Sequence, residues 1–157
     1  MRRRDREVHG TDEIFDILNR CDTLRIGISG DKYPYVVPVS FGAELDNGGI
    51  VIYFHCAKEG MKVELINKNP NVCIEGDIFI KTEEIKHGIT ARYESVIGFG
   101  RCEFLADEEE MLHGLKVITE HYGYFDYGFD KCGGVKNLLV GKIAVEEITG
   151  KRNRKNG

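Results

Sequence analysis

The segment HCAKEGMK, residues 55–62, combines residue types that can bind an anion: an imidazole, two lysines and a glycine. It follows an apolar run, residues 50–54, whose β-branched and aromatic side chains predict a strand. It leads into Met61–Lys68, whose apolar spacing predicts a helix. The first amides of a helix lack internal partners and carry partial positive charge. The sequence therefore favours an anion site within reach of His55 and Lys62, although an ordinary strand-to-helix loop has the same spacing.

Other catalytic patterns in the chain are incomplete. His55 and Glu59 have the i, i+4 spacing of metal ligands, but they lie in a glycine-bounded turn, and there is no HExxH motif. The glycines of Gly98-Phe99-Gly100 lack the third glycine and the following helix of a dinucleotide fingerprint. We therefore expect neither a metal site nor a Rossmann-type nucleotide site.

Cysteines and the remaining histidines are expected to have structural roles. The cysteines show no CxxC pair, which argues against a zinc ribbon and a disulfide framework; they are Cys21, Cys56, Cys73, Cys102 and Cys132. Such thiols usually pack as small hydrophobes, and only Cys56 adjoins the candidate site. Four histidines, His9, His87, His113 and His121, are expected to be solvated or hydrogen-bonded, the last two exposed on a helix.

Length and charge limit the class of protein. A chain of 157 residues fits one domain, 1–157, with a substantial core. The formal net charge of −4 gives no reason to expect a nucleic-acid partner. No apolar run follows the arginine-rich opening MRRRDR, and none approaches the ~20 residues that span a bilayer. We expect a cytoplasmic protein with no membrane partner.

The elements that must position the site are mostly strands. Alternating apolar residues and turn signals predict strands over residues 24–28, 35–45, 50–57, 72–80, 95–105 and 138–148. Helices are predicted over 11–21, 61–69 and 107–122, and residues 81–92 form a loop or a hairpin extension. About six strands without strand–helix alternation favour an antiparallel barrel or sandwich over a parallel sheet.

Pro38 is unusual within its predicted strand. Proline cannot donate to a neighbouring strand, so Pro38 belongs at a sheet edge or a bulge. A ligand ring could occupy the space beside it. Gly98 and Gly100 similarly predict a bulge or a close backbone approach.

Together these features resemble a known family. Pro38 in its apolar strand, FHCAKEGMK, NKNP, YESVIGFGRCEF, the terminal ITGK and the opening RRRDREV are similar to 5-nitroimidazole resistance (Nim) proteins of the pyridoxamine 5′-phosphate oxidase-like superfamily. The resemblance covers Arg2–Lys151. It implies a mainly β fold, a six-stranded antiparallel split barrel with inserted helices. It also implies an FMN cofactor, with FAD as the alternative, and a homodimer with flavin at the subunit interface.

The resemblance assigns cofactor-binding roles to residues in three regions. Val37, Pro38, Val39 and Ser40 would line the flavin ring through their backbone, and His55, Cys56 and Ala57 would follow the ribityl chain. Lys62 would bind the phosphate, with Met61 offering only an amide where the oxidases have arginine, so that Lys58 and His55 would assist. Ser95 and Val96 would reach the site from the partner subunit or the barrel wall.

The activity implied by the resemblance is flavin-dependent reduction of small aromatic compounds, including the nitro group of 5-nitroimidazoles. His55 would be catalytic as the proton donor, or would only hold the cofactor. The tail KRNRKNG lacks a match to the arginine and histidine with which the family's oxidases hold pyridoxal phosphate, which argues against that oxidase activity. The alternative is a non-catalytic flavin- or haem-binding module for storage, sensing or sequestration.

Overall fold

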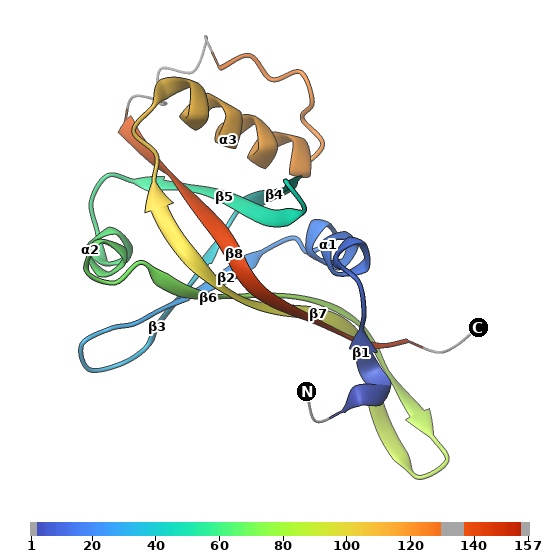
Figure 1. Cartoon of the computed structure of the whole chain (residues 1–157). Coiled ribbons are helices and arrows are strands. Elements are labelled where there is room, and N and C mark those ends of the chain that lie inside the picture. The colour runs from blue at the N-terminus through green and yellow to red at the C-terminus, as the bar shows by residue number, and fades with distance from the viewer. Residues whose placement is uncertain (1–2, 130–136, 155–157) are drawn as a thin grey trace.

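The computed structural model describes residues 3–129 and 137–154, and most of these lie in one antiparallel sheet. Its strands are β1 (Glu7–Val8), β2 (Leu24–Ile28), β3 (Tyr35–Val39), β4 (Phe41–Asp46), β5 (Gly49–Ala57), β6 (Asn71–Ile85), β7 (Gly88–Phe104) and β8 (Leu138–Asn153). They follow the order β3-β2-β6-β7-β8-β5-β4, with β1 paired to β8 (Figure 1). The prediction of a mainly antiparallel, barrel-like fold is confirmed.

The helices pack against this sheet. After a short 3-10 turn, Arg4–Arg6, they are α1 (Thr11–Asn19), α2 (Met61–Lys68) and α3 (Glu108–His121). Helix α3 begins as predicted, because Asp107 caps it by accepting a hydrogen bond from the amide of Glu110 at 3.0 Å. It lies over β4 and β5 (Figure 1). None of the described helices is long and apolar enough to cross a bilayer.

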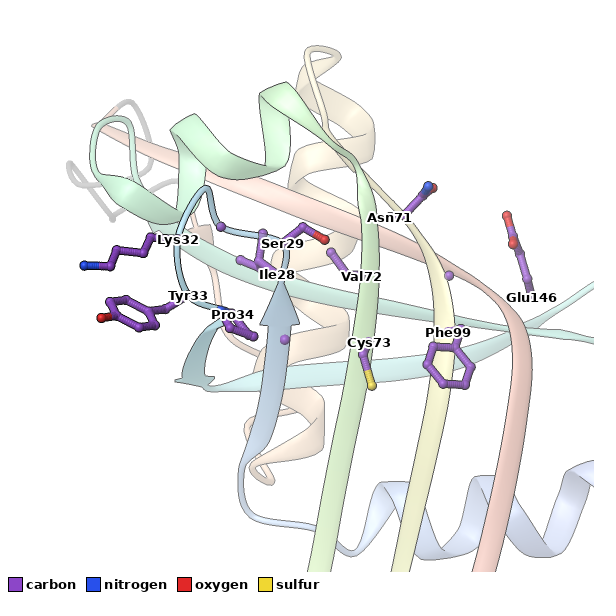
Figure 2. A pocket seen from close by; sticks show the side chains of 13 residues that line it. Ile28, Ser29, Lys32, Tyr33, Pro34, Asn71, Val72, Cys73, Phe99 and Glu146 are labelled. Atoms are coloured by element: carbon purple, nitrogen blue, oxygen red, sulfur yellow. The ribbon is translucent and has the colours of Figure 1, made fainter. Parts of the chain in front are cut away.

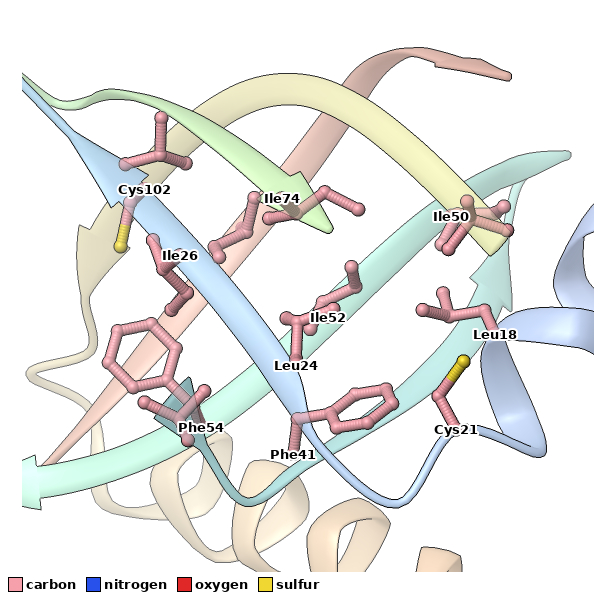
Figure 3. Packing of buried hydrophobic residues seen from close by; sticks show 14 of the residues in the cluster. Leu18, Cys21, Leu24, Ile26, Phe41, Ile50, Ile52, Phe54, Ile74 and Cys102 are labelled. Carbon is pink, nitrogen blue, oxygen red and sulfur yellow. The ribbon is translucent and has the colours of Figure 1, made fainter. Parts of the chain in front are cut away.

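The core fills the inner face of the curved sheet. Leu24, Ile26 and Ile28 of β2 are buried and alternate with exposed Arg25, as their spacing predicts. They meet fully buried Phe41, Phe54 and other apolar side chains from facing strands (Figure 3). The thiols of Cys21, Cys56 and Cys102 are also buried, Cys73 is half-buried, and Cys132 lies outside the described residues.

The strand count differs from the prediction of six, because the described residues form eight strands. The segment predicted as one strand over residues 35–45 is two, β3 and β4, separated at Ser40. The physical reason is a change of partner: β3 pairs only with β2, whereas β4 pairs with β5 at the other end of the strand order. Pro38 therefore lies on an edge strand, as predicted.

Two further segments extend beyond their predicted limits. Residues 81–92 are a hairpin extension rather than a loop, because β6 and β7 stay paired to Ile85 and Gly88. Strand β8 runs to Asn153 instead of residue 148, since its end pairs with Tyr93 of β7. The predicted irregularity at the GFG sequence is present as a register shift between Phe99 and Gly100.

His121 was expected to be exposed on its helix, and this was wrong. Its ring is half-buried and packs on Phe41 with centroids 4.4 Å apart. Its Nε2 lies 2.9 Å from the carbonyl oxygen of Cys21, so this nitrogen carries the proton. His113 is more exposed and lies 2.8 Å from the carboxylate of Glu44.

Candidate functional site

The junction between β5 and α2 presents open backbone amides. Strand β5 is buried from Ile50 to Phe54, after which His55 and the turn over residues 57–60 are exposed. Gly60 precedes α2 with φ 129°, a conformation that suits glycine. No side chain caps the helix, and its first backbone bond runs from the amide of Glu64 to the carbonyl of Gly60. The amides of the first turn are therefore available to a ligand.

The charged side chains at this junction make no ion pair with any residue that the structure describes. In the part of the chain that the structure describes, no hydrogen bond or ion pair engages the side chains of His55, Lys58 or Lys62. Burial raises the pKa of the Cys56 thiol, and the charge of Lys62 opposes this shift. The side chain of Met61 is 59% exposed and carries no charge. The arrangement can hold a phosphate.

Ser40 and His55 adjoin the last pair of the β4–β5 ladder. Phe41 pairs with Phe54, Ser40 directly precedes Phe41, and His55 directly follows Phe54. Both phenylalanines are fully buried, whereas Ser40 and His55 are exposed on the opposite side of the strands. The structure thus joins the β3–β4 connection to the β5–α2 junction.

The other predicted cofactor residues of these segments differ in exposure. Pro38 is exposed opposite Arg25, and Val37 is half-buried opposite Ile26. Val39 and Cys56 belong to the core, so they can offer mainly backbone atoms. Ala57 is exposed at the end of β5.

Ser95 and Val96 are not brought to this junction within one chain. Ser95 pairs with Lys151 of β8, whereas His55 pairs with Val140 of the same strand. These partners are eleven residues apart, about 36 Å along a strand at roughly 3.3 Å per residue. The side chain of Val96 is fully buried in the core.

A buried carboxylate next to Ser95 was missed by the sequence reasoning. Glu94 is completely buried and accepts hydrogen bonds from Arg20 at 2.8 Å, from Arg152 at 2.5 Å and from Arg154. Burial alone would raise its pKa, but the hydrogen bonds from Arg20 and Arg152 outweigh this and lower it. Its position in the sequence could have indicated its burial, because Glu94 lies two residues before buried Val96 and therefore on the same face of β7.

Comparison with known proteins agrees with this architecture. The family model described as pyridoxamine 5′-phosphate oxidase matches residues 10–152. A candidate 5-nitroimidazole antibiotic resistance protein from Bacteroides thetaiotaomicron is 33% identical, with a TM-score of 0.81 over 92% of this chain and 85% of that chain. No curated protein matches the chain.

Two more distant structures share the fold alone. A flavocytochrome from Azotobacter vinelandii is 15% identical, with a TM-score of 0.80 over 98% of this chain and 72% of that chain. An FAD and haem binding protein from Mycobacterium smegmatis is 14% identical, with a TM-score of 0.75 over 95% of this chain and 74% of that chain.

Proposed function

Because the chain belongs to the pyridoxamine 5′-phosphate oxidase family, we propose that it is a flavin-dependent reductase of small aromatic compounds, with 5-nitroimidazoles as the substrate class. FMN is the proposed cofactor and FAD the alternative. The observation that carries the proposal is the uncapped start of α2, where Lys62 has no ion-pair partner among the described residues and His55 is exposed nearby.

The residues of the junction fit a flavin phosphate. The first amides of α2 would donate to phosphate oxygens, and Lys62 would add a charge-assisted hydrogen bond. Lys58 lies on the turn and His55 near the end of β5, and they would supply the positive charge that Met61 lacks. The backbone from Val37 to Ser40 would lie along the ring. When bound, a flavin supplies hydride and electron transfer, and the protein supplies position and electrostatics.

His55 is the proposed proton donor. Reduction of a nitro group consumes protons together with electrons, so a donor must lie beside the substrate. The imidazole of His55 is exposed on the same side as Ser40, and no described residue holds it in a hydrogen bond. A His55→Ala variant that keeps flavin but loses turnover would support this role, whereas loss of flavin would assign His55 to cofactor binding.

We also propose a homodimer with flavin at the interface. The outer face of the sheet exposes apolar side chains that a monomer rarely leaves in water: Val36 is 60%, Phe79 64% and Ile97 45% exposed. Ser95 lies on this face, too far along β8 to meet His55 of its own chain. A second copy would supply the missing strand to each site.

Anaerobic reoxidation tests the proposed reaction. Purified protein should carry flavin absorbance or gain it on addition of FMN, and photoreduced protein should be reoxidised rapidly by a 5-nitroimidazole. The amine should form when reduced protein is in at least about threefold molar excess, because the nitro group takes up six electrons and each reduced flavin supplies two. Flavin binding without reoxidation would favour a storage or sensing module, an alternative that the flavin- and haem-binding neighbours support. Protein that neither carries nor binds flavin would refute both.

A further inference from the structure

The hairpin between β6 and β7 projects from the sheet as an arm, residues 81–92 (Figure 1). Strand β8 ends opposite Tyr93, and the pairing of β2 with β6 stops at Glu75, so no other described strand supports the arm. Its two strands stay paired with each other as far as Ile85 and Gly88. Because a two-stranded hairpin is only marginally stable in water, a further contact would stabilise the arm.

The two faces of the arm differ in what they contact. On the inner face, which continues the side of β7 that carries buried Glu94, Arg92 donates hydrogen bonds to Glu83 and, at 3.1 Å, to Asn153. On the outer face, Ile89 is 78% exposed, the largest exposed fraction of any large hydrophobic side chain among the described residues. The protein's own chain therefore holds the inner face and leaves the outer face open.

The outer face of the arm continues the apolar outer face of the sheet. Alternate residues of β7 from Ile89 to Phe99 lie on one side, in a row about 33 Å long at roughly 3.3 Å per residue. Phe99 ends this row beside Cys73 of β6, at a hollow of about 530 Å³ (Figure 2). Ser95 and Ile97 lie between the two ends, on the face that the proposed second copy covers. The row thus leads from that interface to the arm.

Two-fold symmetry gives the arm a definite place in the proposed homodimer. That assembly brings Ser95 of one copy to His55 of the other, and a two-fold axis makes each contact twice. The axis reverses the line that runs from Ser95 to His55 of its own chain, so the arm beyond Ser95 extends past His55 of the other copy. In that direction the other copy presents the start of α2, where Met61 is 59% exposed.

We propose that the arm of each copy lies over the β5–α2 junction of the other, where Ile89 packs on Met61 of the other copy, and that it covers the flavin phosphate. This rests on the proposed homodimer with flavin at its interface. Contact between the two apolar side chains removes both from water. Lys86 and His87, exposed at the tip of the arm, bring positive charge towards a phosphate that Met61 cannot pair.

Sedimentation equilibrium of the full-length protein without flavin tests the contact. Ile89→Ser should weaken dimerisation about a hundredfold, because each dimer buries this side chain twice and one burial is worth about tenfold. Ile85→Ser is the matched control, since Ile85 is 46% exposed on the inner face of the same arm, opposite Gly88. It should leave the dimer unchanged.

Cross-linking tests the place of the arm. A mixture of Ile89→Cys protein and Met61→Cys protein should form disulfide-linked hybrid dimers on mild oxidation, above the background that the parent gives. Ile85→Cys in place of Ile89→Cys should not. With FMN bound, release of the flavin on dilution should be severalfold faster in Ile89→Ser than in the parent, and Ile85→Ser should keep the parent rate.

The outcomes separate this proposal from the proposed function. A dimeric parent that shows equal losses in Ile89→Ser and Ile85→Ser, or no hybrid cross-link, would overturn the placement of the arm and leave the reductase intact. An unchanged rate of FMN release in Ile89→Ser would show that the arm does not cover the phosphate. A parent that stays monomeric at millimolar concentration would refute the homodimer together with the arm contact.

Discussion

Strand β8 connects two polar regions that use their charges in opposite ways. Near the start of β8, Val140 pairs with His55. In the adjoining β5–α2 junction, Lys58 and Lys62 form no hydrogen bond or ion pair with any described residue. Near the end of β8, Arg152 pairs with Glu94, which also holds Arg20 and Arg154. One region leaves its donors open to solvent, and the other binds its own charges to each other.

Burial explains this difference. A carboxylate removed from water is tolerated only when charged donors surround it, so fully buried Glu94 needs its arginines. The exposed Lys58, the half-buried Lys62 and the first amides of α2 are satisfied by water and can exchange it for a ligand. Paired charges therefore indicate a structural role, and unpaired ones beside a helix start indicate binding. The first region should control ligand affinity, and the second should control stability.

Replacement of Glu94 should have the largest effect. Glu94→Gln leaves three arginines around a neutral group, which should lower the free energy of unfolding by about 3–5 kcal/mol in urea titrations at pH 7. Asp16→Asn is the control, because Asp16 also pairs with Arg20 but is exposed, and it should cost less than about 1 kcal/mol. Similar costs for the two variants would contradict the structural role of Glu94.

Acid titration tests the direction in which the ionisation of Glu94 changes the stability. The pKa of Glu94 is lower in the folded protein than its ordinary 4.5, so the unfolded chain binds the proton more readily. Its stabilising contribution should be complete above pH 4.5 and should decline as the pH falls through the folded pKa. The Glu94→Gln variant should lack this part of the acid dependence.

Replacement of Lys62 should affect affinity and not stability. Lys62→Ala removes a proposed phosphate contact, which should weaken FMN binding by about 1.5–3 kcal/mol, as measured by quenching of flavin fluorescence. Its unfolding free energy should change by less than about 0.5 kcal/mol. Lys68→Ala lies on the same helix, at its other end, and should bind FMN like the parent. Equal titrations for all three proteins would show that Lys62 points elsewhere.

Two glycines that precede helices allow a closer test of whether the start of α2 binds the phosphate. Gly10 before α1 and Gly60 before α2 both have positive φ, at 95° and 129°, and both have open space where a Cβ would stand. Alanine at either position should cost about 1–3 kcal/mol of stability through backbone strain. Only Gly60→Ala should also weaken FMN binding, because only α2 begins at the proposed phosphate site. Loss of FMN affinity in both variants would indicate a global effect.

The elements fixed by neighbouring residues were the ones that sequence could predict. The turn after Asp46 follows from its own residues, because Asn47 and Gly48 favour the positive φ that they have in the hairpin between β4 and β5. The break at Ser40 was missed, because the residues around it favour a strand throughout. It arises from a change of partner strand between β3 and β4, which local preferences do not record.

The same limit applies to the two polar regions. Residues 55–62 are adjacent in the chain, so their strand, turn and helix could be recognised together. In the sequence, Glu94 is 74 residues from Arg20, 58 from Arg152 and 60 from Arg154. Only the folded protein brings these residues together. Whether Ser95 contacts a flavin across a subunit interface stays a prediction, because its own chain keeps it far from His55 along β8.

Two histidines give the smallest expected effect. His121 forms a hydrogen bond within the protein, whereas His55 forms none with a described residue. Burial lowers the pKa of His121 from its ordinary 6.5, while its hydrogen bond to the Cys21 carbonyl opposes this weakly. The unfolded chain therefore binds the proton more readily, and stability should decline as the pH falls below about 6.5. One proton limits the slope to about 1.4 kcal/mol per pH unit.

Unfolding at pH 7.5 and pH 5.5 would measure this slope. His121→Gln should remove it, although the variant also loses ring packing on Phe41 at both pH values. His87→Gln, in the exposed turn between β6 and β7, should retain the parent slope. A slope that persists in His121→Gln would place the titrating group elsewhere.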